Sequence, residues 1–155
     1  MNPALIEVAL HVKDDQEAIA VLSEKLVAAG AVTKEYLPAV MRREKSLPTG
    51  LDLGAVCVAI PHTDETQYIN ASQVAIGVLK DPVTFGSMVD PHEELPVRIV
   101  FLLAMKDPSR QLQLLKYLMR AFQQPDIMRQ IAAADTSDKV ETIWADIMKD
   151  CHIED

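Results

Sequence analysis

A histidine at the end of an apolar stretch is the residue of this sequence most suited to chemistry. His62 follows the apolar residues 55–60 and Pro61, whose ring fixes the backbone, and it opens the polar segment 63–66. This placement predicts an imidazole at the end of a buried strand, with one side open to solvent. A neutral imidazole keeps a free lone pair, so His62 is a candidate metal ligand, general base or nucleophile toward phosphorus.

These three roles need different neighbours. A metal site would use His62, Asp64 and Glu65, which lack the H-x-x-x-H or C-x-x-C spacing of a zinc site, so no metal ion is expected. A hydrolase would need an exposed nucleophile, but there is no G-x-S-x-G elbow, and Cys57 lies within the apolar run. A phosphoryl acceptor needs the imidazole and donors for the phosphoryl oxygens, and Arg43 is a candidate donor. The alternative for Arg43 is a solvated helix face.

The other three histidines have less favourable surroundings. His11 lies in the apolar segment near the start, His92 in a loop rich in Pro and Glu, and His152 in the polar tail. Each is interpreted as a structural or surface residue.

Composition excludes several classes of function. The chain has 155 residues and a net charge of −8, with 15 Lys and Arg against 23 Asp and Glu, which argues against a nucleic-acid partner. Its five glycines form neither G-x-G-x-x-G nor G-x-x-x-x-G-K-[ST], so no glycine-rich nucleotide cradle and no cofactor are expected. The content of 49% hydrophobic residues is that of a globular protein, and the length predicts one domain over residues 1–155.

The cysteines and the lack of long apolar runs indicate the cellular compartment of the protein. Its two cysteines, Cys57 and Cys151, make neither a disulfide framework nor a zinc knuckle, which indicates a reducing environment. The first residues lack a basic leader region, and no apolar run approaches the roughly 18 residues that span a bilayer. We expect a cytoplasmic protein.

Strands and helices are expected to alternate along the chain. The apolar, β-branched pattern predicts strands, and three- and four-residue spacing of apolar residues predicts helices. The predicted strands are residues 5–12, 55–60, 72–80 and 96–105. The predicted helices are residues 15–29, 33–46, 109–123, 125–134 and one after 137, with caps at Asp14 or Asp15, Thr33, and Thr136 or Ser137. This order predicts a single α/β domain with a mixed, largely parallel β-sheet flanked by helices on both faces.

Three short segments resemble the signature of a known family. Residues 41–44 (MRRE), 47–50 (LPTG) and 58–62 (VAIPH) are similar to the signature of mannitol/fructose-type enzyme IIA domains of the bacterial sugar phosphotransferase system (PTS). Residues 111–115 (QLQLL) and 123–127 (QQPDI) most resemble the galactitol-type branch. The resemblance implies one EIIA type-2 domain over residues 1–155.

The resemblance also implies an activity. Such a phosphocarrier is a phosphotransferase component that forms a phosphohistidine intermediate. His62 would accept a phosphoryl group from phospho-HPr on Nε2 and pass it to a cysteine of a sugar-specific enzyme IIB, with Arg43 stabilising the group. A second histidine found in many members corresponds here to Gln111, whose amide can donate a hydrogen bond but no proton or charge. The membrane would be reached only indirectly, through the transporter complex.

Two alternatives remain beside sugar transport through a galactitol-like or fructose-like system. Related enzyme IIA domains use the same phosphorylation to control partner proteins, so a regulatory module is the first. A metal-dependent hydrolase that uses His62, Asp64 and Glu65 is the second.

Overall fold

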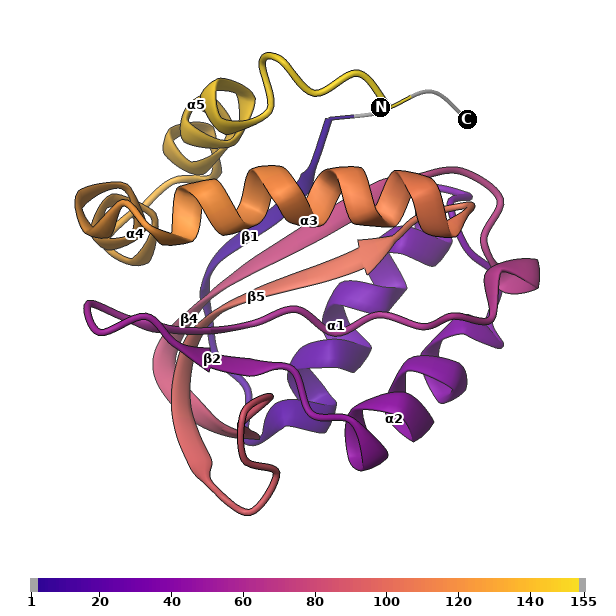
Figure 1. The fold of residues 1–155 in the computed structure, drawn as a ribbon, viewed down its shortest axis with the longest axis horizontal. Coiled ribbons are helices and arrows are strands. Elements are labelled where there is room, and N and C mark those ends of the chain that lie inside the picture. Colours follow the sequence, from indigo (N-terminus) through magenta and orange to yellow (C-terminus); the bar gives the residue numbers. More distant parts are fainter. Residues whose placement is uncertain (1–2, 154–155) are drawn as a thin grey trace.

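One mixed sheet forms the centre of the computed structural model, which describes residues 3–153 (Figure 1). The strands of this described part are β1 (Leu5–Leu10), β2 (Gly50–Asp52), β3 (Cys57–Ala59), β4 (Gln73–Gly86) and β5 (Glu94–Ala104). Their order across the sheet is β1-β4-β5-β3-β2. The pairs β1–β4 and β3–β5 are parallel, whereas β4–β5 and β2–β3 are antiparallel. The predicted mixed sheet of an α/β fold is therefore confirmed.

Helices cover both faces of this sheet, as predicted (Figure 1). One face packs against α1 (Asp15–Ala28) and α2 (Tyr36–Ser46). The other packs against α3 (Pro108–Phe122), α4 (Pro125–Ala132) and α5 (Ser137–Ile147), and a short 3-10 helix, η1 (Thr66–Tyr68), follows β3. The two layers explain why β5 is apolar at successive positions: Val100 and Leu102 contact the first layer, while Phe101 and Leu103 contact the second.

The helix starts follow the predicted caps in two places. The side chain of Asp14 accepts a hydrogen bond from the Glu17 amide at the start of α1, and that of Thr136 accepts one from the Lys139 amide at the start of α5. The predicted cap at Thr33 is wrong, because α2 begins at Tyr36. The backbone N–H of Thr33 instead donates to the carbonyl of Tyr68, next to an antiparallel bridge between Val32 and Ile69, and a turn at residues 34–35 leads into the helix.

The strands differ from the prediction in their bounds and in their number. β1 ends at Leu10 and not at residue 12, β3 is shorter than the predicted 55–60, and β5 begins at Glu94 and not at residue 96. β4 continues past Lys80 to Gly86 and forms a long hairpin with β5, because the apolar alternation resumes at Val83 after an exposed bend. The short strand β2 was not predicted. A Cβ atom at Gly50 would lie 2.5 Å from the carbonyl oxygen of Gly86, so a glycine is needed for β2 to approach the hairpin this closely.

Within residues 3–153, no helix is both long and apolar enough to cross a membrane.

Candidate functional site

The backbone that carries His62 is held by hydrogen bonds on both sides. After β3, the carbonyl of Pro61 accepts a hydrogen bond from the Leu103 amide of β5 at 3.0 Å. The carbonyl of Leu103 in turn accepts from the hydroxyl of Tyr36, which projects from α2 and is fully buried. Burial raises the pKa of this phenol, so it stays a donor. The sheet and α2 therefore fix the position at which His62 leaves the strand.

The imidazole of His62 is itself oriented by the main chain. Its Nδ1 lies 2.7 Å from the carbonyl oxygen of Ile60. Because a carbonyl can only accept, this contact requires the proton on Nδ1 and leaves the lone pair on Nε2. Burial, and then the charge of Arg43, lower the pKa of His62, against the opposing effect of the Ile60 hydrogen bond. The residue is 7% exposed, and a pKa lowered from about 6.5 favours the neutral ring at pH 7.

A buried carboxylate supports the same segment. Glu44 of α2 accepts hydrogen bonds from the Thr49 amide at 2.8 Å and from the Thr49 hydroxyl at 2.7 Å. The Thr49 hydroxyl oxygen accepts from the Ile60 amide at 3.2 Å. Glu44 and Thr49 thus hold the N–H of Ile60, while His62 bonds to its carbonyl. Burial outweighs the two Thr49 hydrogen bonds and raises the pKa of Glu44 to about 7.

Two arginines of α2 face the polar loop after His62. The guanidinium Nε of Arg43 lies 3.5 Å from Asp64 Oδ2, and Arg42 donates to Glu65 at 2.9 Å. Arg43, the candidate donor for phosphoryl oxygens, lies close enough to His62 for its charge to lower the pKa of the histidine. The Arg43 side chain is 24% exposed and that of Asp64 is 78% exposed, so an incoming anion can replace this carboxylate. Arg43 is thus a partly buried cation with a loosely held counter-charge.

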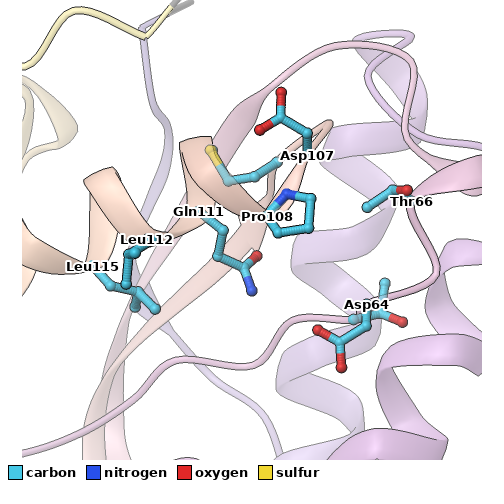
Figure 2. A pocket seen from close by; sticks show the side chains of 9 residues that line it. Asp64, Thr66, Asp107, Pro108, Gln111, Leu112 and Leu115 are labelled. Carbon is cyan, nitrogen blue, oxygen red and sulfur yellow. The ribbon is translucent and has the colours of Figure 1, made fainter.

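Gln111 lies on the first turns of α3, across a shallow hollow from the His62 loop (Figure 2). The hollow has a volume of about 170 Å³, and its walls include Thr63, Asp64, Asp107 and Gln111. Figure 2 shows the amide end of Gln111 pointing toward the loop that carries Asp64. Within residues 3–153 this amide makes no hydrogen bond, so its donors are free. His62 is not in the wall of the hollow, but its neighbour Thr63 is.

The remaining sequence candidates lie apart from this arrangement. His11, His92 and His152 are exposed, as expected for surface residues. Among residues 3–153 no group of three His, Cys, Asp or Glu side chains could hold a metal ion. Asp64 and Glu65, the other residues of the hydrolase interpretation, are turned toward arginines.

Sequence reasoning gave no role to Glu44 and Thr49. Both stand in the segments that carried the family resemblance, but their chemistry was not interpreted. A signal was present, because Tyr36, Val40 and Glu44 follow one another at four-residue spacing on a single helix face. The first two are fully buried, and the third shares their face.

Comparison with known proteins identifies the family. Residues 1–146 match the family model described as "Phosphoenolpyruvate-dependent sugar phosphotransferase system, EIIA 2". The chain belongs to this family. The resemblance seen in the sequence is therefore confirmed, and PTS EIIA components are phosphotransferases.

Similar proteins include both a transport component and a regulator. The chain is 30% identical over 130 residues to the galactitol-specific EIIA component of Escherichia coli K12, covering 83% of this chain and 84% of that protein. It is 29% identical over 132 residues to the transcriptional regulator ManR of Bacillus subtilis, covering 84% of this chain and 19% of ManR.

The fold of EIIA proteins is also seen in a solved complex. The solution structure of enzyme IIAMTL with phosphorylated enzyme IIBMTL from Escherichia coli matches with a TM-score of 0.73 and 24% identity. The match covers 92% of this chain and 99% of that chain. At 24% identity, this structural match shows that the two proteins share a fold.

Proposed function

We propose that this chain is a phosphocarrier of a galactitol-like or fructose-like sugar transport system, with residues 1–155 acting as one EIIA domain. His62 accepts a phosphoryl group from phospho-HPr and passes it to a cysteine of enzyme IIB. The observation that carries the proposal is the hydrogen bond of His62 Nδ1 to the Ile60 carbonyl, which leaves the Nε2 lone pair free. The lowered pKa of the ring keeps this lone pair unprotonated at neutral pH.

The transfer itself needs few further groups. The Nε2 lone pair forms a bond to phosphorus as the N–P bond of phospho-HPr breaks, and the electron pair of that bond returns to the HPr imidazole. The Arg43 guanidinium exchanges Asp64 for the phosphoryl oxygens and stabilises their charge. In the second step the cysteine thiolate of enzyme IIB attacks the same phosphorus, and His62 leaves as a neutral imidazole.

Gln111 is assigned a supporting role at this site. Its free amide lines the same hollow as Thr63 and Asp64. There it can donate a hydrogen bond to a phosphoryl oxygen. It adds no charge, so its contribution is smaller than that of Arg43. The pairing of β3 with β5 and the Leu103 hydrogen bond to Pro61 hold the main chain beside His62 in place for transfer to and from a partner protein.

Support for the partner and the sugar class comes from the relatives. A family match to the EIIA components, a galactitol-specific relative and a solved IIA–IIB complex all favour exchange with an enzyme IIB. The match to ManR favours a second candidate, in which the same phosphorylation controls a partner protein. The fold and the site serve both functions equally, because both begin with phosphorylation of His62.

Reconstituted transfer tests the proposal and separates the two candidates. The protein is incubated with labelled phosphoenolpyruvate, enzyme I and HPr, and the phosphorylated form is then offered a panel of enzyme IIB domains. We expect acid-labile labelling that His62→Ala abolishes and the matched surface variant His92→Ala retains. Rapid discharge to one enzyme IIB supports transport. Label that persists in His62→Ala contradicts the phosphocarrier, and labelling with no discharge to any enzyme IIB favours the regulator.

A further inference from the structure

A second hollow lies at the opposite end of the strand that leads to His62. It has a volume of about 510 Å³ and lies between the start of β3, the bend of β4, the first half of β5 and the end of α4. Its walls include Val56, Pro82, Pro96, Arg98, Arg129 and Ala132. In Figure 1, α4 lies at the left and α2, which carries Arg43, at the lower right. The hollow is therefore separate from the phosphoryl-transfer site.

The charge of this hollow is unusual for an acidic protein. Both charged side chains on its wall are arginines, although the chain has a net charge of −8. Arg98 is half-buried, and its Nε is covered by protein without a hydrogen-bond partner. Within residues 3–153 no carboxylate forms an ion pair with it. A half-buried guanidinium with a covered, unpartnered Nε and no counter-charge is well suited to bind an anion.

A β-bulge places Arg98 in this position. Cys57 of β3 pairs with Val97 of β5, but the next residue, Val58, pairs with Ile99, so Arg98 is the extra residue between the two pairs. Val97 packs in the α1/α2 layer, and Ile99 packs in the layer of α3 to α5. Bulges of this kind change the direction of a side chain, so that it no longer follows the alternation between the two faces of the sheet. The bulge lets Arg98 line the hollow beside α4.

Arg129 supplies the second positive charge from α4. Its Nη1 donates to Asp126 at 3.1 Å, but the two side chains are 61% and 91% exposed, so this pair is weak and exchanges readily with solvent. Asp126 is not in the wall of the hollow. An alternative role for Arg98 is structural: its positive charge would stabilise the partial negative charge at the C-terminal end of α4. The two roles predict different effects of removing the Arg98 charge.

We propose that this hollow binds a small phosphomonoester. The forked guanidinium groups match the geometry of phosphate oxygens, and a phosphomonoester carries a charge of about −1.5 to −2 at neutral pH, which two arginines balance. Val56, Pro82 and Ala132 provide apolar contact for the organic part. The volume is that of a pocket for a small molecule.

Binding is tested by NMR with glucose 6-phosphate as the probe. We expect saturable shifts of the Val56 and Ala132 amides with a dissociation constant of about 1 mM or lower. Glucose, which lacks the phosphate, is expected to cause no shift at the same concentration. Citrate distinguishes a phosphate site from a general anion site, and equal or tighter binding of citrate would overturn the assignment to phosphomonoesters.

Three variants identify the residues that bind the probe. Arg98→Gln should weaken binding about tenfold or more, since it removes a charge-assisted hydrogen-bond donor, and Arg129→Gln should weaken it by a smaller factor. Arg120→Gln is the matched control, because it removes the same charge from α3, outside the hollow. We also expect Arg98→Gln to unfold at the same or a higher temperature than the wild type without ligand.

The opposite results would overturn the proposal. If Arg98 only complements the end of α4, Arg98→Gln will lower the unfolding temperature and the wild type will show no saturable shift. Shifts that persist unchanged in Arg98→Gln would also contradict the site. Labelling of His62 through HPr is expected to remain intact in Arg98→Gln, so failure here leaves the proposed phosphocarrier unaffected.

Discussion

At the scale of single residues, the site depends on which nitrogen of one histidine is free. The Ile60 carbonyl fixes the proton of His62 on Nδ1, and burial with the nearby charge of Arg43 disfavours a second proton. The neutral ring is then a competent nucleophile without help from a metal or a general base. This arrangement supports the proposal that a small site with few polar groups takes part in phosphoryl transfer.

The pKa of His62 provides a direct prediction. Burial and Arg43 lower it from the ordinary value of about 6.5, so the ring should remain neutral from pH 8 to about 6.5 and become protonated only below that range. NMR titration of the ring protons measures the midpoint. In Arg43→Gln the midpoint should move upward because a neighbouring positive charge is lost, while Arg43→Lys should keep it low. A wild-type midpoint above 6.5 would contradict the described environment.

The pKa of Glu44 makes a prediction about stability. Burial raises this pKa from 4.5 to about 7 in the folded protein, so between these values the folded state binds more protons than the unfolded state. Stability contributed by this group is therefore lost as the pH rises from about 4.5 to about 7. The wild type should therefore lose up to about 3 kcal/mol of unfolding free energy between pH 5 and pH 8 that Glu44→Gln does not lose. Urea unfolding of both proteins at the two pH values checks this, and parallel pH profiles would contradict it.

At the scale of elements, the strand and helix that carry the site were predictable from the sequence. The apolar run before Pro61 predicted a covered strand, and β3 with its extension to Ile60 is buried on both faces. The start of α2 was not predictable, since the pairing of Thr33 with Tyr68 joins residues far apart in the chain. The burial of Glu44 was predictable in principle from its spacing to Val40. Its bonds to Thr49 were not, because they depend on the turn between α2 and β2.

Another long-range effect is the placement of Arg98. The sequence shows one charged residue within the apolar segment 96–105, but not the direction in which it points. That direction depends on a bulge that forms only when β5 pairs with β3. Local periodicity carries no information on such a register shift.

The helix α3, which carries Gln111, depends on its cap. Asp107 accepts hydrogen bonds from the Arg110 amide and the Arg110 Nε, each at 3.0 Å. Asp107→Ala should lower the urea concentration at the unfolding midpoint, since it leaves a helix N–H without a partner, whereas Asp107→Asn should retain most of the stability. Urea unfolding measures both. An alanine variant as stable as the wild type would show that the cap contributes nothing.

At the scale of the whole molecule, the proposed function requires the segment around His62 to be reached by two partner proteins in turn. Two helical layers pack on the sheet, and His62 follows β3 by three residues, next to the loop residues Thr63 and Asp64 that line the hollow at the start of α3. The net charge of −8 favours rapid encounter with a partner that presents a basic face. The absence of a glycine-rich nucleotide motif in the sequence agrees with the proposed function, in which the phosphoryl group would come from a histidine of another protein.

The net charge of the protein predicts that the rate of phosphoryl transfer from phospho-HPr depends on salt concentration. Raising the salt concentration from about 20 mM to about 500 mM should slow phosphoryl transfer from phospho-HPr several-fold, since screening removes the attraction between the partners. Stopped-flow or quenched-flow kinetics under second-order conditions measures the effect. Phosphorylation by phosphoramidate, which needs no protein docking, is the control and should change less. An unchanged rate with phospho-HPr would exclude electrostatic attraction as the basis of the encounter.

In the proposed function, the Nε2 atom of His62 receives the phosphoryl group. Phosphorus NMR of the protein phosphorylated through HPr, with peptide mapping by mass spectrometry, tests it most directly. The structure predicts one signal with the chemical shift of an Nε2-phosphorylated histidine, located in the peptide that contains His62. A signal from an Nδ1-phosphorylated ring, or from a peptide without His62, would contradict it, because Nδ1 is held by the Ile60 carbonyl.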